Sequence, residues 1–132
     1  MLRTAVAVFV IVSAVFSWSQ SSPQYLACMN KAKAQMEMNG CASQEAARVD
    51  AKLNHVYGQL LTKAGTDANA VAKIKAAERA WIAYRDAYIE AMYPASDKQA
   101  QYGSIYPMDV ALLTTKLTQQ HITDLEELLK QY

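Results

Sequence analysis

Apolar residues beyond position 22 recur at steps of three and four, which is the spacing of amphipathic helices. No segment alternates apolar and polar residues as a half-buried strand does. Ala, Lys, Gln, Glu and Leu are frequent, and these residues lose little side-chain entropy in helices. The pattern therefore predicts an all-α domain with four helices.

The first two predicted helices are separated by a glycine turn. The first extends from Pro23 to about Glu37 and ends at Asn39-Gly40, a pair suited to a helix stop with positive φ. Ser43 is the predicted N-cap of the second helix, which closes near Ala64-Gly65. The apolar series of this second helix is Ala46, Val49, Leu53, Val56, Tyr57 and Leu60.

The last two predicted helices are separated by a long loop. Asp67 is the predicted N-cap of the third helix, which runs to about Met92 before Pro94 interrupts it. The segment from Tyr93 to Pro107 has no sustained period and is predicted to be a loop. The fourth helix starts near Met108 or Asp109. The buried stripes are Val71, Ile74, Ala77, Trp81, Tyr84 and Tyr88 in the third helix, and Val110, Leu113, Leu117, Leu125, Leu128 and Leu129 in the fourth.

The first 19 residues have the layout of a secretory signal peptide. Arg3 supplies the positive charge, an uncharged apolar run follows from Ala5 to Trp18, and Ser19 stands in a small-x-small context for cleavage. The apolar run is shorter than the roughly 20 residues that a membrane-spanning helix needs. We therefore expect a signal peptide at 1–19 and a periplasmic or secreted domain at 20–132, with no membrane insertion once the signal is removed.

The charge balance narrows the classes of partner. The chain carries 13 basic and 12 acidic residues, and Arg3 is the one charged residue in the predicted signal peptide. The remaining domain is therefore close to neutral. A nucleic-acid-binding protein needs a concentrated basic surface, and adhesion to an anionic membrane surface needs one too. Neither class is supported.

The chain has two cysteines, Cys28 and Cys41, and an exported chain meets an oxidising compartment in which thiols pair. A disulfide is predicted, worth roughly 3 kcal/mol in chain entropy. It would give a disulfide-stapled helical hairpin packed in a small antiparallel four-helix bundle. Two cysteines are too few for a structural zinc site, and His55 and His121 lack partners at ligand spacing. We predict no metal and no cofactor.

The stretch ERAWIAYRDAY, residues 78–88, sets four charged residues among three aromatic rings. A catalytic interpretation would need a carboxylate near a second acid, base or nucleophile in a cleft, and the sequence offers little of that. The favoured interpretation is structural, with Trp81 in the core and Arg85 along it, paired with a carboxylate because an unpaired buried guanidinium is costly. Asp50 is the preferred carboxylate, and Glu78 is the alternative. The predicted polar core comprises Asp50, Asn54, Glu78, Trp81 and Arg85.

The predicted signal, the cysteine pair and three stretches, AARVDAKLNHVYGQLL, KIKAAERAWIAYRDAY and YGSIYPMDVALLTTKLTQQHITDLEELL, together resemble the LprI-type lysozyme-inhibitor family of small exported bacterial domains. The resemblance covers nearly all of the domain. It implies a compact, disulfide-bonded, all-α domain in the periplasm or cell envelope, and inhibition of lysozyme. Its most specific pieces are Asp50 with Leu53-Asn54 and Tyr57, the ERAWIAYRDA stretch, Gly103-Ser104 and Leu117-Thr118.

The chain departs from the pattern of this family at three positions. Members usually have cysteines where this chain has Tyr88 and Leu113, and the resemblance implies that those two cysteines bond. We hypothesise that Tyr88 and Leu113 pack against each other here and replace the covalent link by apolar contact. Relatives commonly have Arg where this chain has His121, so the resemblance carries no ion pair over to that position.

The predicted loop after Met92 is the candidate partner-binding element. It carries three tyrosines, which offer contact area at small entropy cost, on what should be a rigid bundle. The alternative is that these rings cover the open end of the bundle. The predicted contact residues are Tyr93, Asp97, Tyr102 and Tyr106.

Three classes of function follow. The class favoured through the resemblance is a protein-binding domain that inhibits lysozyme-like peptidoglycan hydrolases by occluding their cleft. The second is an envelope interaction or stress protein with another partner and no lysozyme inhibition. An enzyme has the least support, and we interpret the chain as non-enzymatic. Lysozymes are commonly basic, so an inhibitor would profit from an acidic face, which the balanced net charge does not indicate.

Overall fold

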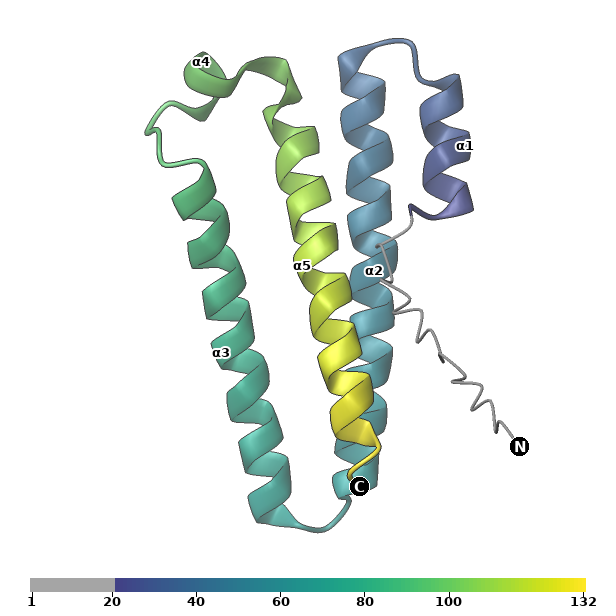
Figure 1. Ribbon diagram of the computed structural model, residues 1–132, viewed down its shortest axis with the longest axis vertical. Coiled ribbons are helices and arrows are strands. Elements are labelled where there is room, and N and C mark those ends of the chain that lie inside the picture. The colour runs from purple at the N-terminus through teal and green to yellow at the C-terminus, as the bar shows by residue number, and fades with distance from the viewer. Residues whose placement is uncertain (1–20) are drawn as a thin grey trace, which may run out of the picture.

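The computed structural model describes residues 21–132, and the predicted signal peptide lies outside them. The described chain is helical, without a strand, and successive long elements run in opposite directions (Figure 1). The predicted all-α, disulfide-stapled bundle is confirmed. The helices are α1 (Pro23–Lys31), α2 (Gln35–Ala64), α3 (Ala68–Met92), α4 (Lys98–Tyr102) and α5 (Tyr106–Leu129), with a 3₁₀ turn η1 (Gly103–Ile105) before α5.

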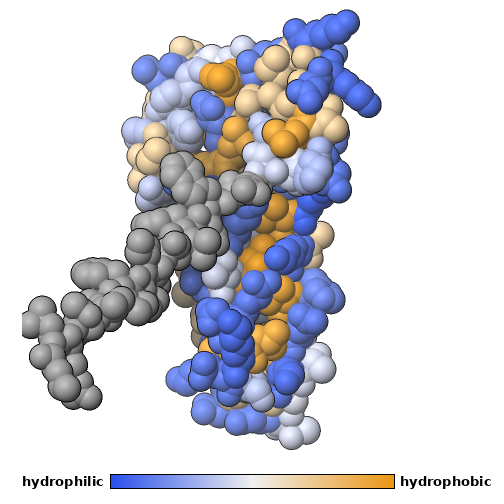
Figure 2. Space-filling model, turned by 45° about the vertical axis from the view of Figure 1, so that its right-hand side comes forward, coloured by the Kyte–Doolittle hydropathy of each residue, from blue (hydrophilic) through white to orange (hydrophobic). Residues whose placement is uncertain are grey.

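The helix α5 lies between α2 and α3, and the short α1 packs on the other side of α2 (Figure 1). One block of the core joins α2, α3 and α5 around the fully buried Leu60. A second block joins α1, α2 and the first half of α5 around Tyr25, Cys41 and Ala42. In Figure 2, hydrophobic residues form a band along the molecule between hydrophilic flanks. The predicted stripes of α2 and α5 are buried or half-buried, and so are Val71, Ile74 and Trp81 of α3. The rest of the stripe predicted for α3 is wrong, because Ala77, Tyr84 and Tyr88 are exposed: that side of α3 faces away from α2 and α5.

The turn between α1 and α2 is not where the sequence predicts it. The helix α1 ends at Lys31, and α2 already begins at Gln35, so Asn39-Gly40 and Ser43 lie inside α2. The Glu37 carboxylate accepts hydrogen bonds from the backbone N–H groups of Lys33 (2.6 Å) and Ala34 (3.3 Å). These bonds satisfy donors at the start of α2, which outweighs the local tendency of Asn-Gly to stop a helix.

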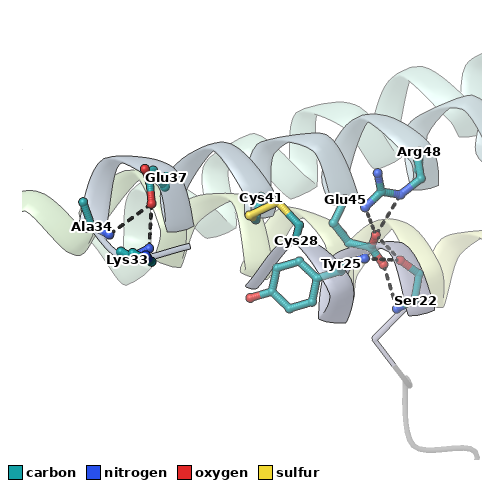
Figure 3. Close-up of a disulfide and its surroundings, with 9 residues drawn as sticks. All are labelled: Ser22, Tyr25, Cys28, Lys33, Ala34, Glu37, Cys41, Glu45 and Arg48. Atoms are coloured by element: carbon teal, nitrogen blue, oxygen red, sulfur yellow. Dashed lines mark hydrogen bonds and ion pairs between the residues drawn. A yellow bond between two sulfur atoms is a disulfide. The ribbon is translucent and has the colours of Figure 1, made fainter. Parts of the chain in front are cut away.

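The disulfide between Cys28 and Cys41 is confirmed, with the two Cα atoms 5.7 Å apart. It links the middle of α1 to the second turn of α2 (Figure 3). Because the turn lies at 32–34, the two cysteines flank it more evenly than a turn at Asn39-Gly40 would allow. The hairpin is therefore shorter on the α1 side than predicted.

The start of α3 agrees with prediction and the following loop does not. Asp67 accepts hydrogen bonds from the backbone of Asn69 (3.0 Å) and Ala70 (2.9 Å), and α3 ends at Met92. The segment after it contains α4 and η1, too short to show a periodic pattern. The helix α5 begins at Tyr106, earlier than predicted, because Pro107 is favoured in the first turn of a helix.

Candidate binding surface and polar core

The segment from Tyr93 to Pro107, called here the α4 cap, contains three tyrosines whose rings contact one another. The ring of Tyr93 is 5.3 Å from that of Tyr102 and 5.3 Å from that of Tyr106, edge-on to both, and Tyr102 and Tyr106 stack at 5.6 Å. All three residues are half-buried. Burial raises the pKa of Tyr93, and the charge of Asp109 adds to this. The predicted contact tyrosines are thus also the internal packing of the cap.

Hydrogen bonds within the cap fix the shape of its backbone. The Tyr102 hydroxyl accepts from the N–H of Ala95 at 3.2 Å. The Asp97 carboxylate accepts from the N–H of Ala100 at 2.9 Å and caps α4, while Asp97 itself is exposed. Asp97 therefore combines a local structural role with a charge that a partner can reach.

Two further contacts tie the cap to the long helices. The ammonium group of Lys98 donates to Glu90 of α3 at 2.8 Å and also to the backbone oxygen of Tyr93. The hydrogen bond with Glu90 raises the pKa of Lys98. Asn39 of α2 donates its side-chain N–H to the backbone oxygen of Ser104 at 2.9 Å. The cap is consequently fastened to both α3 and α2.

A polar cluster joins α3 to α5 through residues of the ERAWIAYRDAY stretch. The Glu78 carboxylate lies 2.7 Å from Nε2 of His121, and both side chains are largely buried. The Trp81 ring stacks on the His121 ring at 4.1 Å, and the Arg85 guanidinium lies 5.1 Å from the Trp81 centroid. The residues thus link two helices through the core, which is a structural role.

Both carboxylates predicted as the partner of Arg85, Asp50 and the alternative Glu78, are wrong. The Arg85 guanidinium binds the neighbouring Asp86 at 2.7 Å, whereas Asp50 is exposed on α2 and accepts a hydrogen bond from Asn54 at 3.1 Å. Of the predicted polar core, Glu78, Trp81 and Arg85 lie together, but Asp50 and Asn54 face solvent. The packing of α2 on the other helices sets its rotation about its own axis, and that rotation directs Asp50 and Asn54 to the solvent.

Sequence reasoning missed His121 as the partner of Glu78. His121 follows Leu117 by four residues and precedes Leu125 by four, so it lies on the buried stripe of α5. That spacing could have predicted that His121 is buried beside the other helices. The hypothesised packing of Tyr88 on Leu113 stays a prediction. Tyr88 is 39% exposed, and its ring lies against that of Tyr84, with the ring centroids 5.8 Å apart.

A second polar cluster, also missed, holds the start of α1 on α2. The Glu45 carboxylate accepts from the hydroxyl of Ser22 at 2.6 Å and from its N–H at 3.1 Å (Figure 3). Arg48 donates to the same carboxylate at 2.6 Å. Burial alone would raise the pKa of Glu45, which is 2% exposed, but the hydrogen bonds from Ser22 and Arg48 lower it overall. The buried carboxylate is therefore a charged anchor.

Hollows lie on the surface of the described residues. One of about 330 Å³ lies beside Glu45 and Lys116, and a shallower one of about 680 Å³ runs along α2 past His55 and Gly58 to Leu129.

Within residues 21–132 no His, Cys, Asp and Glu side chains gather as metal ligands. In the same range, none of the helices has both the length and the apolar character to cross a bilayer.

Comparisons with known proteins identify the family. A family model described as "Lysozyme inhibitor LprI" matches residues 28–125. The chain is also similar to "Uncharacterized protein R02472" of Rhizobium meliloti (strain 1021), with 34% identity over 111 residues that cover 76% of this chain and 77% of the relative. No solved structure matches significantly. The protein belongs to the LprI lysozyme inhibitor family.

Proposed function

We propose that this protein is an exported inhibitor that binds lysozyme-like peptidoglycan hydrolases. The observation that carries the proposal is the family match over residues 28–125, which takes in the disulfide, the long helices and the α4 cap. The family is described by its inhibition of lysozyme. Inhibition of this kind requires a stable surface that blocks the hydrolase and no reaction by the inhibitor itself.

Export is supported by the predicted signal peptide and by the disulfide. A bond between Cys28 and Cys41 persists in an oxidising compartment such as the periplasm or the extracellular space. Cleavage after Ser19 would leave three residues before Pro23, where α1 begins. Mass spectrometry of the protein recovered from the periplasm or medium should give the mass of residues 20–132 with two hydrogens lost to the disulfide. Recovery of the uncleaved, reduced chain from the cytoplasm would contradict export.

We propose that the α4 cap makes the contact, through Tyr93, Asp97, Tyr102 and Tyr106. Its aromatic packing and its bonds to α2 and α3 order the segment before a partner arrives. A pre-ordered segment loses little conformational entropy on binding. The half-buried rings would then present their outer edges to the hydrolase, while Asp97 presents a charge at the tip.

The charge distribution also favours this end of the molecule. From Glu78 to Asp109 the chain carries five acidic and three basic residues, although the whole chain has a net charge of +1. Asp86 and Glu90 expose 60% and 69% of their side chains. A basic hydrolase would be attracted to this local excess of negative charge, which the net charge conceals.

A turbidity assay tests the proposal, with lysozyme acting on peptidoglycan in the presence of the purified protein. We expect saturable inhibition. Asp97→Asn removes the charge but keeps an N-cap for α4, and should weaken inhibition several-fold at low salt and less at high salt. Asp124→Asn, at an exposed position on α5, is the matched control and should inhibit like wild type. No inhibition at about 100 μM protein would overturn the proposal and leave the envelope-partner alternative.

A further inference from the structure

The second half of α3 has one face without any charge. Around the helix axis, at about 100° per residue, the five charged residues between Ala76 and Met92 all fall on one half of the circumference. The other half is called here the α3 tyrosine face. It consists of Trp81, Tyr84, Tyr88 and Met92 with the alanines at 76, 77, 80, 83, 87 and 91.

Most of this face is uncovered. Tyr84 is 57% exposed, Tyr88 39% and Met92 51%, and the alanines are exposed as well, while Trp81 packs on His121. Earlier on the same helix, Ile74 is only 4% exposed because it enters the core. Figure 1 shows α3 as the outermost helix on its side of the bundle. An amphipathic helix whose apolar half faces solvent over four turns is a candidate interface.

We propose that a second copy of this chain covers the α3 tyrosine face, with the two α3 helices antiparallel about a twofold axis. If the axis passes between Arg85 and Asp86, Tyr84 lies opposite Ala87 of the second copy. In the same register Tyr88 lies opposite Ala83 of the second copy. Each large ring then meets a small residue, and each copy uses the same surface, as a closed twofold interface requires.

Charge favours a second copy over a different partner. The face has no cation or carboxylate with which to select an oppositely charged protein. Beyond the predicted signal peptide the chain has 12 basic and 12 acidic residues, so two copies meet without net repulsion. Of the charged residues that border the face, Glu78 contacts His121, Arg85 contacts Asp86 and Glu90 contacts Lys98. Self-association in this arrangement leaves these three pairs intact.

The size of the face sets the strength of the dimer. A stretch of 17 residues makes a helix about 25 Å long. One helix of this length supplies less than the roughly 800 Å² per partner that stable complexes bury. The dimer should consequently be weak, with a Kd on the order of 100 μM. It is independent of hydrolase binding, which we assign to the α4 cap.

Sedimentation velocity of the secreted, oxidised protein tests the dimer between about 5 and 500 μM. We expect a reversible monomer–dimer equilibrium. Ala87→Glu places a carboxylate opposite Tyr84 and should weaken dimerisation at least tenfold. Ala72→Glu is the matched control, because Ala72 is exposed on α3 but lies before the 76–92 stretch that the second copy would cover, and it should dimerise like wild type. Circular dichroism checks that both variants are folded.

Three results would overturn the proposal. The first is a wild-type protein that stays monomeric at 500 μM, and the second is equal weakening of the dimer by both glutamate variants. The third is a wild-type protein that is monomeric but whose inhibition of the hydrolase is lost on Ala87→Glu. The last would assign the face to the hydrolase. The register has its own test, since Tyr84→Cys chains mixed with Ala87→Cys chains should form a mixed disulfide dimer on oxidation. Cross-linking of Tyr84→Cys chains only with themselves would indicate parallel helices and refute the arrangement.

Discussion

The helices α1 and α4 are both short and lie near the same end of the bundle, but they are held there by different means (Figure 1). The disulfide joins α1 to α2, and the Tyr25 side chain of α1 is buried in the core. The Glu45 carboxylate of α2 accepts a hydrogen bond from Ser22, the N-cap of α1. No residue of α4 is buried, and the α4 cap depends on stacked rings and a few partly exposed hydrogen bonds.

This difference has consequences for stability and for function. An isolated helix of nine residues is unstable in water, so α1 needs its covalent link and its buried contacts. The α4 cap can open without exposing the main core, because its three rings contact one another and belong to neither block of the core. A segment that is held by its own contacts can offer a partner a preformed surface, whereas α1 is part of the cooperative fold.

The largest effect should come from removing the disulfide. The double variant Cys28→Ala and Cys41→Ala frees a loop with a sequence separation of 13 in the unfolded chain, and should lower the free energy of unfolding by about 3 kcal/mol. Denaturant titration of both proteins measures this. Reduction of wild type by dithiothreitol serves as the control and should reproduce the loss. An unchanged midpoint would show that buried contacts alone hold α1.

An intermediate effect should come from Glu45→Gln, which keeps the shape of the side chain and removes its charge. Because Ser22 and Arg48 lower the pKa of Glu45 below 4.5, the carboxylate contributes stability above about pH 4.5 and loses it as the pH falls through the folded-state value. The variant should be less stable than wild type by about 2 kcal/mol at pH 7. Thermal unfolding of both proteins from pH 7 to pH 3 measures the difference, which should shrink on acidification. A constant difference would refute the charged anchor.

The smallest effect on global stability should come from Tyr102→Phe in the α4 cap. The substitution removes the acceptor for the N–H of Ala95 and retains the ring stacking, so local opening should become easier by about 1 kcal/mol. Hydrogen exchange of the Ala95 amide should accelerate roughly fivefold, while the thermal midpoint stays within about a degree. Tyr132→Phe at the exposed C-terminus is the control. A drop in the midpoint comparable to that of the disulfide variant would place the cap in the cooperative core.

Sequence-based prediction succeeded where one local signal stood alone and failed where two local signals competed or a distant residue decided. The N-cap Asp67 and the end of α3 at Met92 depend on neighbours in the chain and were predicted correctly. The Asn39-Gly40 turn was also inferred from local preference, but the Glu37 bonds placed the turn before it. The pairing of Glu78 with His121 joins residues 43 positions apart, and the pattern of α5 contained the signal for it. The candidate contact residues of the cap were named, but not their packing on one another.

The sequence by itself determined the helical class, the disulfide partners and the apolar stripes of α2 and α5, because helix periodicity and the pairing of two thiols require no knowledge of distant contacts. The tertiary structure decided which charges pair, how far α2 extends, and which half of α3 faces solvent. The physical reason is that the rotation and ending of each helix depend on the free energy of the whole packed bundle. Local preferences of about 1 kcal/mol yield to the burial of larger surfaces.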